Sequence, residues 1–153
     1  MSDQKPDTIV IEFQHAEKSS IVYNYPILKR ENGSRERKSF DASDVIYLLM
    51  PDRFANRNLS NDSVEEMTDK YNRSDKDGRH GGDIQGIIDH VDYIHNLGAT
   101  AIWSTPICED NDAQVSYHTY AQSDLYRIDP RYGTHDDYKN LAEALHQRDM
   151  HLI

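Results

Sequence analysis

Short apolar runs, each followed by a long polar stretch and a helical pattern, constrain the fold of this 153-residue chain more than any other feature. The runs are 45–50 (Val-Ile-Tyr-Leu-Leu-Met) and 99–103 (Ala-Thr-Ala-Ile-Trp), and a third starts at His151. Continuous apolar runs are typical of strands that are buried on both faces, as in parallel sheets. The order strand–helix–strand–helix–strand therefore predicts an α/β fold with parallel strands and outer helices.

Helical periodicity is clear in two segments. The first predicted helix follows Asp83 as N-cap, ends before Gly98, and carries one apolar stripe: Ile84, Ile87, Ile88, Val91, Ile94 and Leu97. The second opens with a capping box at Thr134 and Asp137. Its predicted apolar face consists of Tyr138, Leu141, Ala142 and Leu145.

The two connections from strand to helix, 51–82 and 104–133, are about thirty residues long, whereas the returns are nearly absent. Long loops in compact domains are usually functional, and ligands of parallel α/β folds bind at the carboxyl ends of the strands. A Rossmann fold is disfavoured because no tight Gly-rich turn follows the first strand. The loop lengths fit the first three strands and two helices of a (β/α)8 TIM barrel. Three strands cannot close a barrel, so self-association through open edges is one expectation.

The first forty residues differ in pattern. Segments 8–13 and 21–28 alternate with period 2, which predicts half-buried strands that belong to a larger sheet. A charged segment with an Asn-Gly turn signal follows. We predict three regions: a strand-forming remnant over 1–28, a linker over 29–43, and the barrel part over 44–153.

Charge and hydropathy exclude several classes of partner. With 17 basic and 27 acidic residues the formal charge is −10, so nucleic-acid binding is not expected. No apolar run approaches the ~20 residues of a membrane span, and residues 1–6 lack the apolar stretch of a signal peptide. The compartment stays open: the chain as written would be cytoplasmic, whereas full-length relatives can be periplasmic or secreted. No membrane partner is expected. The single cysteine, Cys108, cannot form an internal disulfide.

The first long loop is rich in oxygen-bearing side chains. Carboxylates, amides and backbone carbonyls are the ligands that Ca²⁺ prefers. The relevant residues are Asp52, Asn56, Asn58, Asn61 and Asp62, followed by His80-Gly81-Gly82-Asp83. A calcium site is one interpretation; a turn-rich loop in which Asn and Asp bond their own backbone is the other. The spacing is not that of an EF-hand.

The second long loop contains Tyr117-His118-Thr119-Tyr120. A tyrosine ring can stack on a sugar while a neighbouring histidine bonds a hydroxyl, although ordinary loop packing explains the pattern as well. His90 and His95 are five residues apart and do not share a helix face as zinc ligands would. No nucleophile elbow, phosphate loop or zinc-protease motif is present, and no carboxylate pair can be assigned to acid–base work.

Several motifs, in order, resemble one known family. The segments are Asp44–Asn56, Gly81–Ile87 (Gly-Gly-Asp-x-x-Gly), Leu97–Pro106, and Tyr117–Tyr120 with Asp124, Tyr126, Asp129, Pro130, Tyr132, Gly133 and Thr134. They are similar to the first barrel strand, first helix, second strand and Tyr-His-Gly-Tyr segment of the α-amylase family of glycoside hydrolases, most of all to cyclomaltodextrinases and neopullulanases. Those relatives carry an amino-terminal β-sandwich, so the resemblance implies that residues 8–40 are the last strands of one.

The resemblance implies retaining hydrolysis of α-1,4-glucosidic bonds in maltodextrin, cyclodextrin or starch by an Asp nucleophile, a Glu acid–base and a second Asp. All three belong to later strands, so this chain is expected to be an amino-terminal portion without catalytic residues. The implied Ca²⁺ ligands are Asn56, Asn58, Asn61, Asp62, the carbonyl of Gly81, and Asp83. The implied substrate-binding residues are Tyr120, which stacks under the sugar, and His118. The alternative is a non-catalytic module that binds calcium or an α-glucan.

Three residues depart from the family pattern. Thr119, Arg57 and Asp149 stand where relatives usually have glycine. If those positions need positive φ, each side chain costs about 1 kcal/mol.

Overall fold

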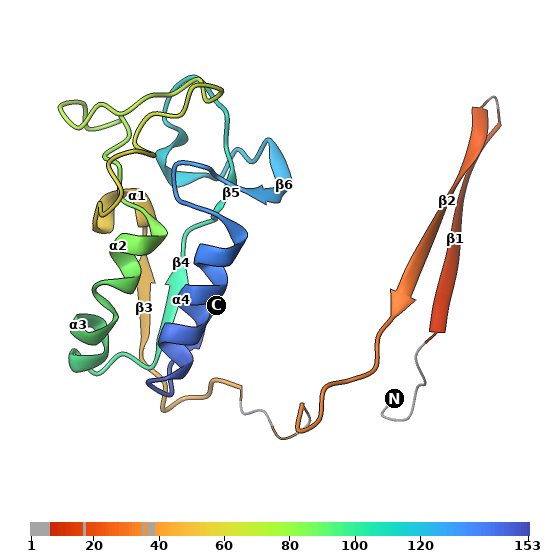
Figure 1. Ribbon diagram of the computed structural model, residues 1–153, viewed down its shortest axis with the longest axis horizontal. Helices are drawn as coiled ribbons and strands as arrows, with labels where there is room; N and C mark the ends of the chain where they lie inside the picture. Colours follow the sequence, from red (N-terminus) through yellow and green to blue (C-terminus); the bar gives the residue numbers. More distant parts are fainter. Residues whose placement is uncertain (1–6, 17, 35, 37–38) are drawn as a thin grey trace. The chain divides into compact units, whose positions relative to one another are not determined.

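The computed structural model describes residues 7–16, 18–34, 36 and 39–153, which belong to two compact units, Met1–Ser39 and Phe40–Ile153 (Figure 1). The chain start, where we predict no signal peptide, lies outside the described residues, as do positions 35 and 37–38 of the predicted linker. In the part of the chain that the structure describes, no helix is long and apolar enough to cross a membrane.

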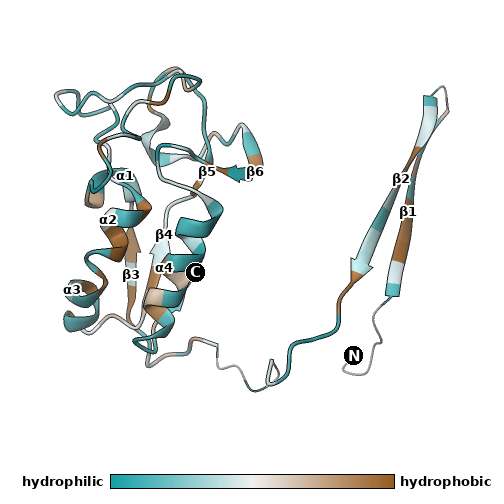
Figure 2. Ribbon diagram, viewed as in Figure 1, coloured by the Kyte–Doolittle hydropathy of each residue, from teal (hydrophilic) through white to brown (hydrophobic). Residues whose placement is uncertain are grey.

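The first unit is an antiparallel hairpin of β1 (Asp7–His15) and β2 (Lys18–Ile27). Both predicted strands are confirmed. The register pairs Ile9 with Tyr25 and Ile11 with Tyr23, so apolar side chains share one face. Figure 2 shows the hydrophobic stretch on β1. This face is exposed within the described hairpin, and the larger sheet that would cover it remains a prediction.

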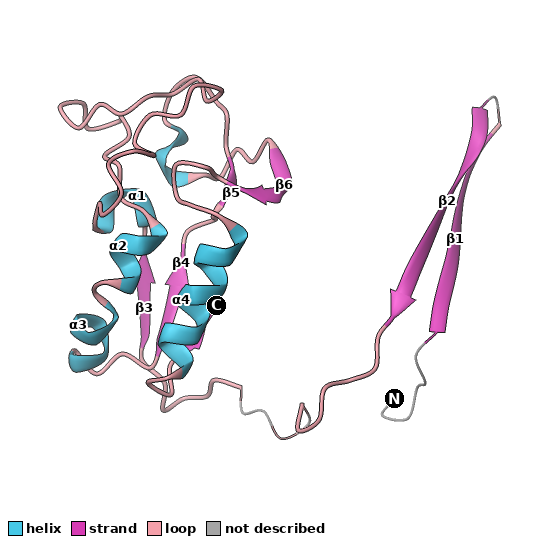
Figure 3. Ribbon diagram, viewed as in Figure 1, coloured by secondary structure: helices cyan, strands magenta, loops and turns pink. Residues whose placement is uncertain are grey.

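The second unit contains a parallel sheet in the order β3 (Ile46–Leu49), β4 (Ala101–Ser104) and β7 (His151–Leu152). The parallel strand order predicted from the apolar runs is therefore confirmed. Helices α2 (Ile84–Ile88) and α4 (His135–His146) pack against each other beside this sheet (Figure 3). The core between sheet and helices includes Leu49, Ile84, Ile87, Ile102, Leu141 and Leu145, all at most 2% exposed.

The prediction that these strands are buried on both faces is wrong. Leu49 and Ile102 point into the core, whereas Leu48 and Trp103, which are register partners on the opposite face, are 66% and 53% exposed. Period-2 alternation sends successive side chains to opposite faces, and the described core lies on one face only.

The predicted single helix over 84–97 is two helices, α2 and α3 (Val91–Asn96). His90 between them has φ −116° and ψ 11°, which breaks the helical backbone, and its Nδ1 lies 2.7 Å from the carbonyl oxygen of Gly86. Most of the predicted stripe is buried nonetheless, except that Leu97 is 56% exposed. The break turns α3 without removing Val91 and Ile94 from the core.

Both predicted helix starts are confirmed. The Asp83 carboxylate accepts a hydrogen bond from the Gly86 N–H at 2.6 Å. Thr134 and Asp137 form the reciprocal capping box of α4. A four-residue helix that we did not predict, α1 (Pro51–Phe54), follows β3 directly.

The polarity of the second long loop predicts an irregular structure, but part of the loop is regular. It forms a small antiparallel pair, β5 (Cys108–Glu109) and β6 (Asp124–Ile128), and a 3-10 turn, η1 (Ser116–His118). Leu125 and Tyr126 of β6 are exposed, and Ile128 alone on this strand is buried. The pairing therefore lacks the apolar alternation that identifies a strand from sequence.

Candidate functional site

The two long loops leave the carboxyl ends of β3 and β4 and meet at the same edge of the sheet (Figure 1). Direct hydrogen bonds join them. Arg79 of the first loop donates to the carbonyl oxygen of Ser116 at 3.1 Å, and Ser116 donates from Oγ to Asp69 at 2.9 Å. Thr68 N–H donates to Asn111 Oδ1 at 2.7 Å. The predicted calcium loop and the predicted sugar-binding segment therefore share one edge.

A buried charge network lies beneath the junction of the loops. Arg79, Asp52, Asp129 and Arg131 are each at most 1% exposed. Arg79 lies 3.6 Å from Asp52 and 3.7 Å from Asp129, and its guanidinium carbon is 4.8 Å from the centre of the Tyr132 ring. Two cations thus face two carboxylates, which is the balance that burial of charge requires.

Asp129 is the most strongly bonded member of this network. Arg131 donates to its two carboxylate oxygens at 2.9 and 2.7 Å, a bidentate pair. Burial pushes the pKa of Asp129 up, but the hydrogen bond from Arg131 and the charges of Arg79 and Arg131 outweigh it, so the pKa lies below its usual value. Arg131 also bonds the backbone carbonyl of Asp69 at 2.8 Å. The network therefore links both loops to Asp129 and Arg131, which lie shortly before α4.

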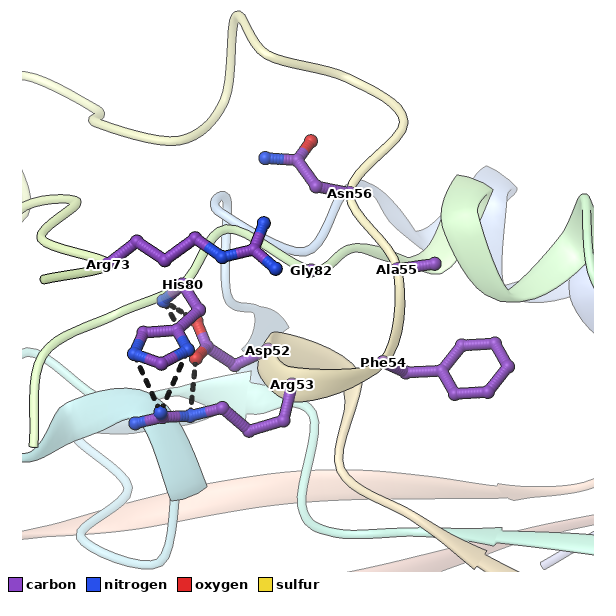
Figure 4. A pocket seen from close by; sticks show the side chains of 8 residues that line it. All are labelled: Asp52, Arg53, Phe54, Ala55, Asn56, Arg73, His80 and Gly82. Carbon is purple, nitrogen blue, oxygen red and sulfur yellow. Dashed lines mark hydrogen bonds and ion pairs between the residues drawn. The ribbon is translucent and has the colours of Figure 1, made fainter. Parts of the chain in front are cut away.

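The carboxylate of Asp52, on α1, contacts both a backbone N–H group and an arginine side chain (Figure 4). Its carboxylate accepts from the His80 N–H at 2.9 Å and pairs with Arg53 Nε at 3.0 Å. Arg53 Nη1 lies 2.8 Å from His80 Nε2, and the guanidinium carbon lies 4.0 Å from the centre of the Tyr117 ring. Asp52, Arg53 and His80 border a small cavity of about 80 Å³, which is also lined by Asn56, Arg73 and Gly82.

The predicted sugar-binding residues stand at the end of η1. Tyr120 is 67% exposed, and its N–H donates to His118 Nδ1 at 3.0 Å. The His118 ring lies between two tyrosines, 5.3 Å from the ring centre of Tyr117 and 5.6 Å from that of Tyr120. An imidazole whose Nδ1 accepts this hydrogen bond has its N–H at Nε2, where it can donate to a hydroxyl. The structure thus brings an exposed aromatic face and a hydrogen-bond donor together.

The six predicted metal ligands are only partly brought together. Asn56 donates from Nδ2 to Asp62 Oδ1 at 2.7 Å, and a Cβ on Gly81, which has φ +83°, would lie 2.5 and 2.7 Å from those two atoms. Asp83 is buried but accepts from the backbone N–H groups of Arg57 and Asn58 at 3.0 and 2.7 Å. The Asn58 side-chain oxygen instead accepts from Ser60 Oγ at 2.6 Å.

Some oxygen atoms at this place have no protein partner. Asn56 Oδ1 and Asn61 Oδ1 are buried and accept no hydrogen bond. Burial raises the pKa of Asp62 despite the hydrogen bond from Asn56, and the charge of Asp83 adds to the shift. The buried, unpartnered oxygen of Asn56, whose amide nitrogen bonds Asp62, together with the nearby charge of Asp83, fits a hard cation such as Ca²⁺. The described residues contain no group of three His, Cys, Asp or Glu side chains suited to a metal, so such a site would depend on amide and carbonyl oxygens.

Sequence reasoning missed the buried network. Arg79 and Arg131 lie in polar stretches where charged residues are normally solvated, and nothing in their spacing distinguishes them from exposed neighbours. Asp129 and Tyr132 were named only as residues of the family pattern, and neither the burial of Asp129 nor the hydrogen bond from the 1% exposed Tyr132 to the carbonyl of Tyr117 at 2.7 Å could be read from the sequence. The burial of Tyr132 raises the pKa of its hydroxyl above the usual range.

Long loops at the carboxyl edge of parallel strands are where (β/α)8 barrels place their ligand sites. A family model described as the catalytic domain of α-amylase matches residues 48–153, and the chain belongs to that family.

Two similar proteins of known sequence illustrate the relationship. Alpha-amylase 2 of Schwanniomyces occidentalis is 39% identical over 141 residues, which cover 88% of this chain and 26% of that protein. Neopullulanase 2 of Thermoactinomyces vulgaris is 38% identical over 110 residues, 71% of this chain and 18% of that protein. The chain thus spans about a quarter or less of the length of these relatives.

Solved structures agree with the assignment. An Anoxybacillus α-amylase is 43% identical, with a TM-score of 0.64 over 72% of this chain and 23% of that one. The Geobacillus thermoleovorans α-amylase, solved with acarbose, is 38% identical, with a TM-score of 0.62 over 72% of this chain and 22% of that one. The second unit therefore has the fold of the corresponding part of an α-amylase barrel.

Proposed function

We propose that this chain forms the amino-terminal part of an enzyme that cleaves α-1,4-glucosidic bonds of maltodextrin, cyclodextrin or starch with retention. In this proposal the chain contributes one wall of the sugar site, with Tyr120 stacking on a glucose ring and His118 Nε2 donating to a hydroxyl. The catalytic Asp, Glu and Asp belong to barrel strands that this chain does not contain. The observation that carries the proposal is the exposed Tyr120 ring beside His118, at the carboxyl edge of a family-matched sheet.

Calorimetric titration of the 153-residue chain with maltoheptaose tests the sugar wall. We expect binding that Tyr120→Ala weakens about tenfold, because an aromatic stacking face is removed. Tyr126→Ala is the matched control, since Tyr126 is 91% exposed but lies on β6. Equal affinities of the two variants would contradict the assignment of Tyr120.

A reducing-sugar assay tests the placement of the catalytic groups. We expect no release from starch, pullulan or cyclodextrin by this chain, because retaining hydrolysis needs a nucleophile and an acid–base that the proposal assigns elsewhere. Release above a blank, lost in Tyr120→Ala, would show that the chain carries catalytic groups of its own.

We further propose that Ca²⁺ binds beside the first loop through Asn56, Asn61, Asp62, the Gly81 carbonyl and Asp83. Bound there, the ion would supply positive charge against the carboxylates of Asp62 in the loop and Asp83 at the N-cap of α2. The support is the pair of unpartnered amide oxygens and the raised pKa of Asp62. Asn58 contributes to the loop through Ser60 and is the least supported of the ligands implied by resemblance.

Thermal unfolding with CaCl₂ and with a chelator tests this site. Free Ca²⁺ at one hundred times its Kd should stabilise the fold by about 2.7 kcal/mol, an increase in Tm of about 5–11 °C for a chain of this size. Asp62→Asn should remove most of the increase. Asp112→Asn, an exposed carboxylate in the second loop, should not. An increase that is the same in both variants would rule out this ligand set.

A further inference from the structure

Two β-branched residues flank η1 in a backbone conformation that such residues rarely adopt. Val115 has φ 62° and ψ 19°, and Thr119 has φ 57° and ψ 29°. The left-handed region brings Cβ too close to the neighbouring carbonyl, so β-branched residues populate it only where the surroundings hold them there. Strain of this kind is a reason to look for a positional role.

The surroundings of Thr119 are unusually confining. Its side chain is 0% exposed, and its hydroxyl donates to the carbonyl oxygen of Pro106, two residues beyond the end of β4. Its N–H donates to the carbonyl of Ser116 at 3.2 Å, which closes the η1 turn. The Thr119 hydroxyl thus ties the end of the turn to the sheet. A glycine would adopt the same backbone angles without strain but would have no group to make this bond.

The bond bears directly on the exposed ring. Thr119 is the residue between His118 and Tyr120, and the backbone angles at 119 set the direction in which the chain leaves the turn. Tyr120, 67% exposed, is bonded through its N–H to His118 Nδ1 at 3.0 Å. Little side-chain packing holds so exposed a ring, so its orientation depends on the backbone before it.

We propose that Thr119 is a positioning residue that locks the Tyr120–His118 pair in its sugar-facing orientation through the hydroxyl bond to Pro106. This inference rests on the function proposed above for that pair. In this arrangement the strained backbone is the means of preorganisation: the loop is ordered before sugar arrives, so less conformational freedom is lost on binding.

Three substitutions separate the hydroxyl from the shape of the side chain. Thr119→Val keeps the β-branched shape and removes the bond, Thr119→Ser keeps the bond, and Thr119→Gly removes bond and strain together. Asp149→Gly is the matched control, because Asp149 has φ 54° in the segment after α4 and its replacement relieves strain away from η1.

Amide hydrogen exchange of the full chain is the first readout. We expect the Tyr120 amide to exchange at least about fivefold faster in Thr119→Val and Thr119→Gly, the effect of losing one buried hydrogen bond. Thr119→Ser and Asp149→Gly should stay within about twofold of the original chain. The core amide of Ile102 reports global unfolding, so the change in exchange rate at Tyr120 is judged after the change at Ile102 in the same variant has been subtracted.

Maltoheptaose calorimetry is the second readout, and affinity should fall in the same two variants. An unchanged exchange rate of the Tyr120 amide in Thr119→Val, or a Thr119→Val chain that is unfolded throughout, overturns the proposal that Thr119 positions Tyr120. Failure of the original chain to bind maltoheptaose while its Tyr120 amide stays protected overturns the proposed function instead. Binding that is equal in all variants despite faster exchange shows that the ordering does not serve sugar recognition.

Discussion

Arg79 gives the most demanding test of how the two loops are held together. It is 1% exposed, pairs with Asp52 and Asp129 at 3.6 and 3.7 Å, and donates to the Ser116 carbonyl and hydroxyl oxygens at 3.1 and 3.2 Å. Arg79→Met keeps most of the side-chain length and removes the charge and both hydrogen bonds. The variant therefore leaves two buried carboxylates with one cation fewer.

The expected cost follows from what remains. Removing one partner of a buried ion pair usually costs about 3–5 kcal/mol, because the other charge stays buried. Here each carboxylate keeps a second cation: Arg53 pairs with Asp52 at 3.0 Å, and Arg131 with Asp129 at 2.7 Å. We therefore expect the lower end of the range, about 3 kcal/mol, a decrease in Tm of about 6–12 °C.

Denaturant unfolding of the 153-residue chain, followed by circular dichroism, measures this cost. Arg127→Met is the matched control, since Arg127 also pairs with two carboxylates, Glu66 and Glu109, but is 46% exposed. Exposed pairs contribute about 0–1 kcal/mol. If Arg79→Met costs no more than Arg127→Met, the buried network does not hold the loops and the reasoning is refuted.

Three further predictions concern local features. Thr134→Ala should lower the free energy of unfolding by about 1 kcal/mol through loss of the α4 capping box; an unchanged midpoint in denaturant would contradict it. Asp149→Gly should raise Tm by about 2–4 °C, because glycine adopts φ 54° without strain; a lower Tm would show that the Asp side chain stabilises this turn. The lowered pKa of Asp129 stabilises the folded state above the unfolded value of 3.8, and this contribution is lost as pH falls through the lower folded value. Denaturation between pH 5 and pH 2.5 should show this loss at high salt, which screens exposed pairs but not Asp129; a flat profile would contradict it.

The predicted departures from the family pattern had mixed outcomes. Thr119 and Asp149 have positive φ, as the glycine pattern of relatives implies. Arg57 does not have positive φ, so the condition for strain is not met there. Its N–H donates to Asp83 at 3.0 Å, a role that any residue other than proline can fill through its backbone. Backbone strain can be predicted from such a departure only where the relatives use glycine for its positive φ.

Local chemistry is where sequence reasoning succeeded. Hydrogen-bonding side chains at helix starts act within three residues, so Asp83 and Thr134 could be identified as caps without any tertiary information. The apolar runs around Leu49 and Ile102 likewise predicted parallel strands, because continuous apolar runs are typical of parallel sheets, although one face of these strands is exposed in the described chain. The sugar contact at Tyr120 and His118 came from the family resemblance, because the residue types alone fit loop packing as well, and it stays a prediction.

Sequence reasoning failed for contacts between residues that are far apart in the chain. Arg79 is 37 residues from Ser116 and 50 from Asp129, and a charged residue in a polar loop looks the same in sequence whether it is buried or solvated. The break at His90 coincides with a side-chain contact to the Gly86 carbonyl, and periodicity does not reveal it because the helical stripe continues across it. Periodicity records which face of a segment is apolar, so it determines elements, their caps and their order. Which charges are buried together, and which loop edge presents Tyr120, depends on contacts between distant segments, whose energies exist only once the chain has folded.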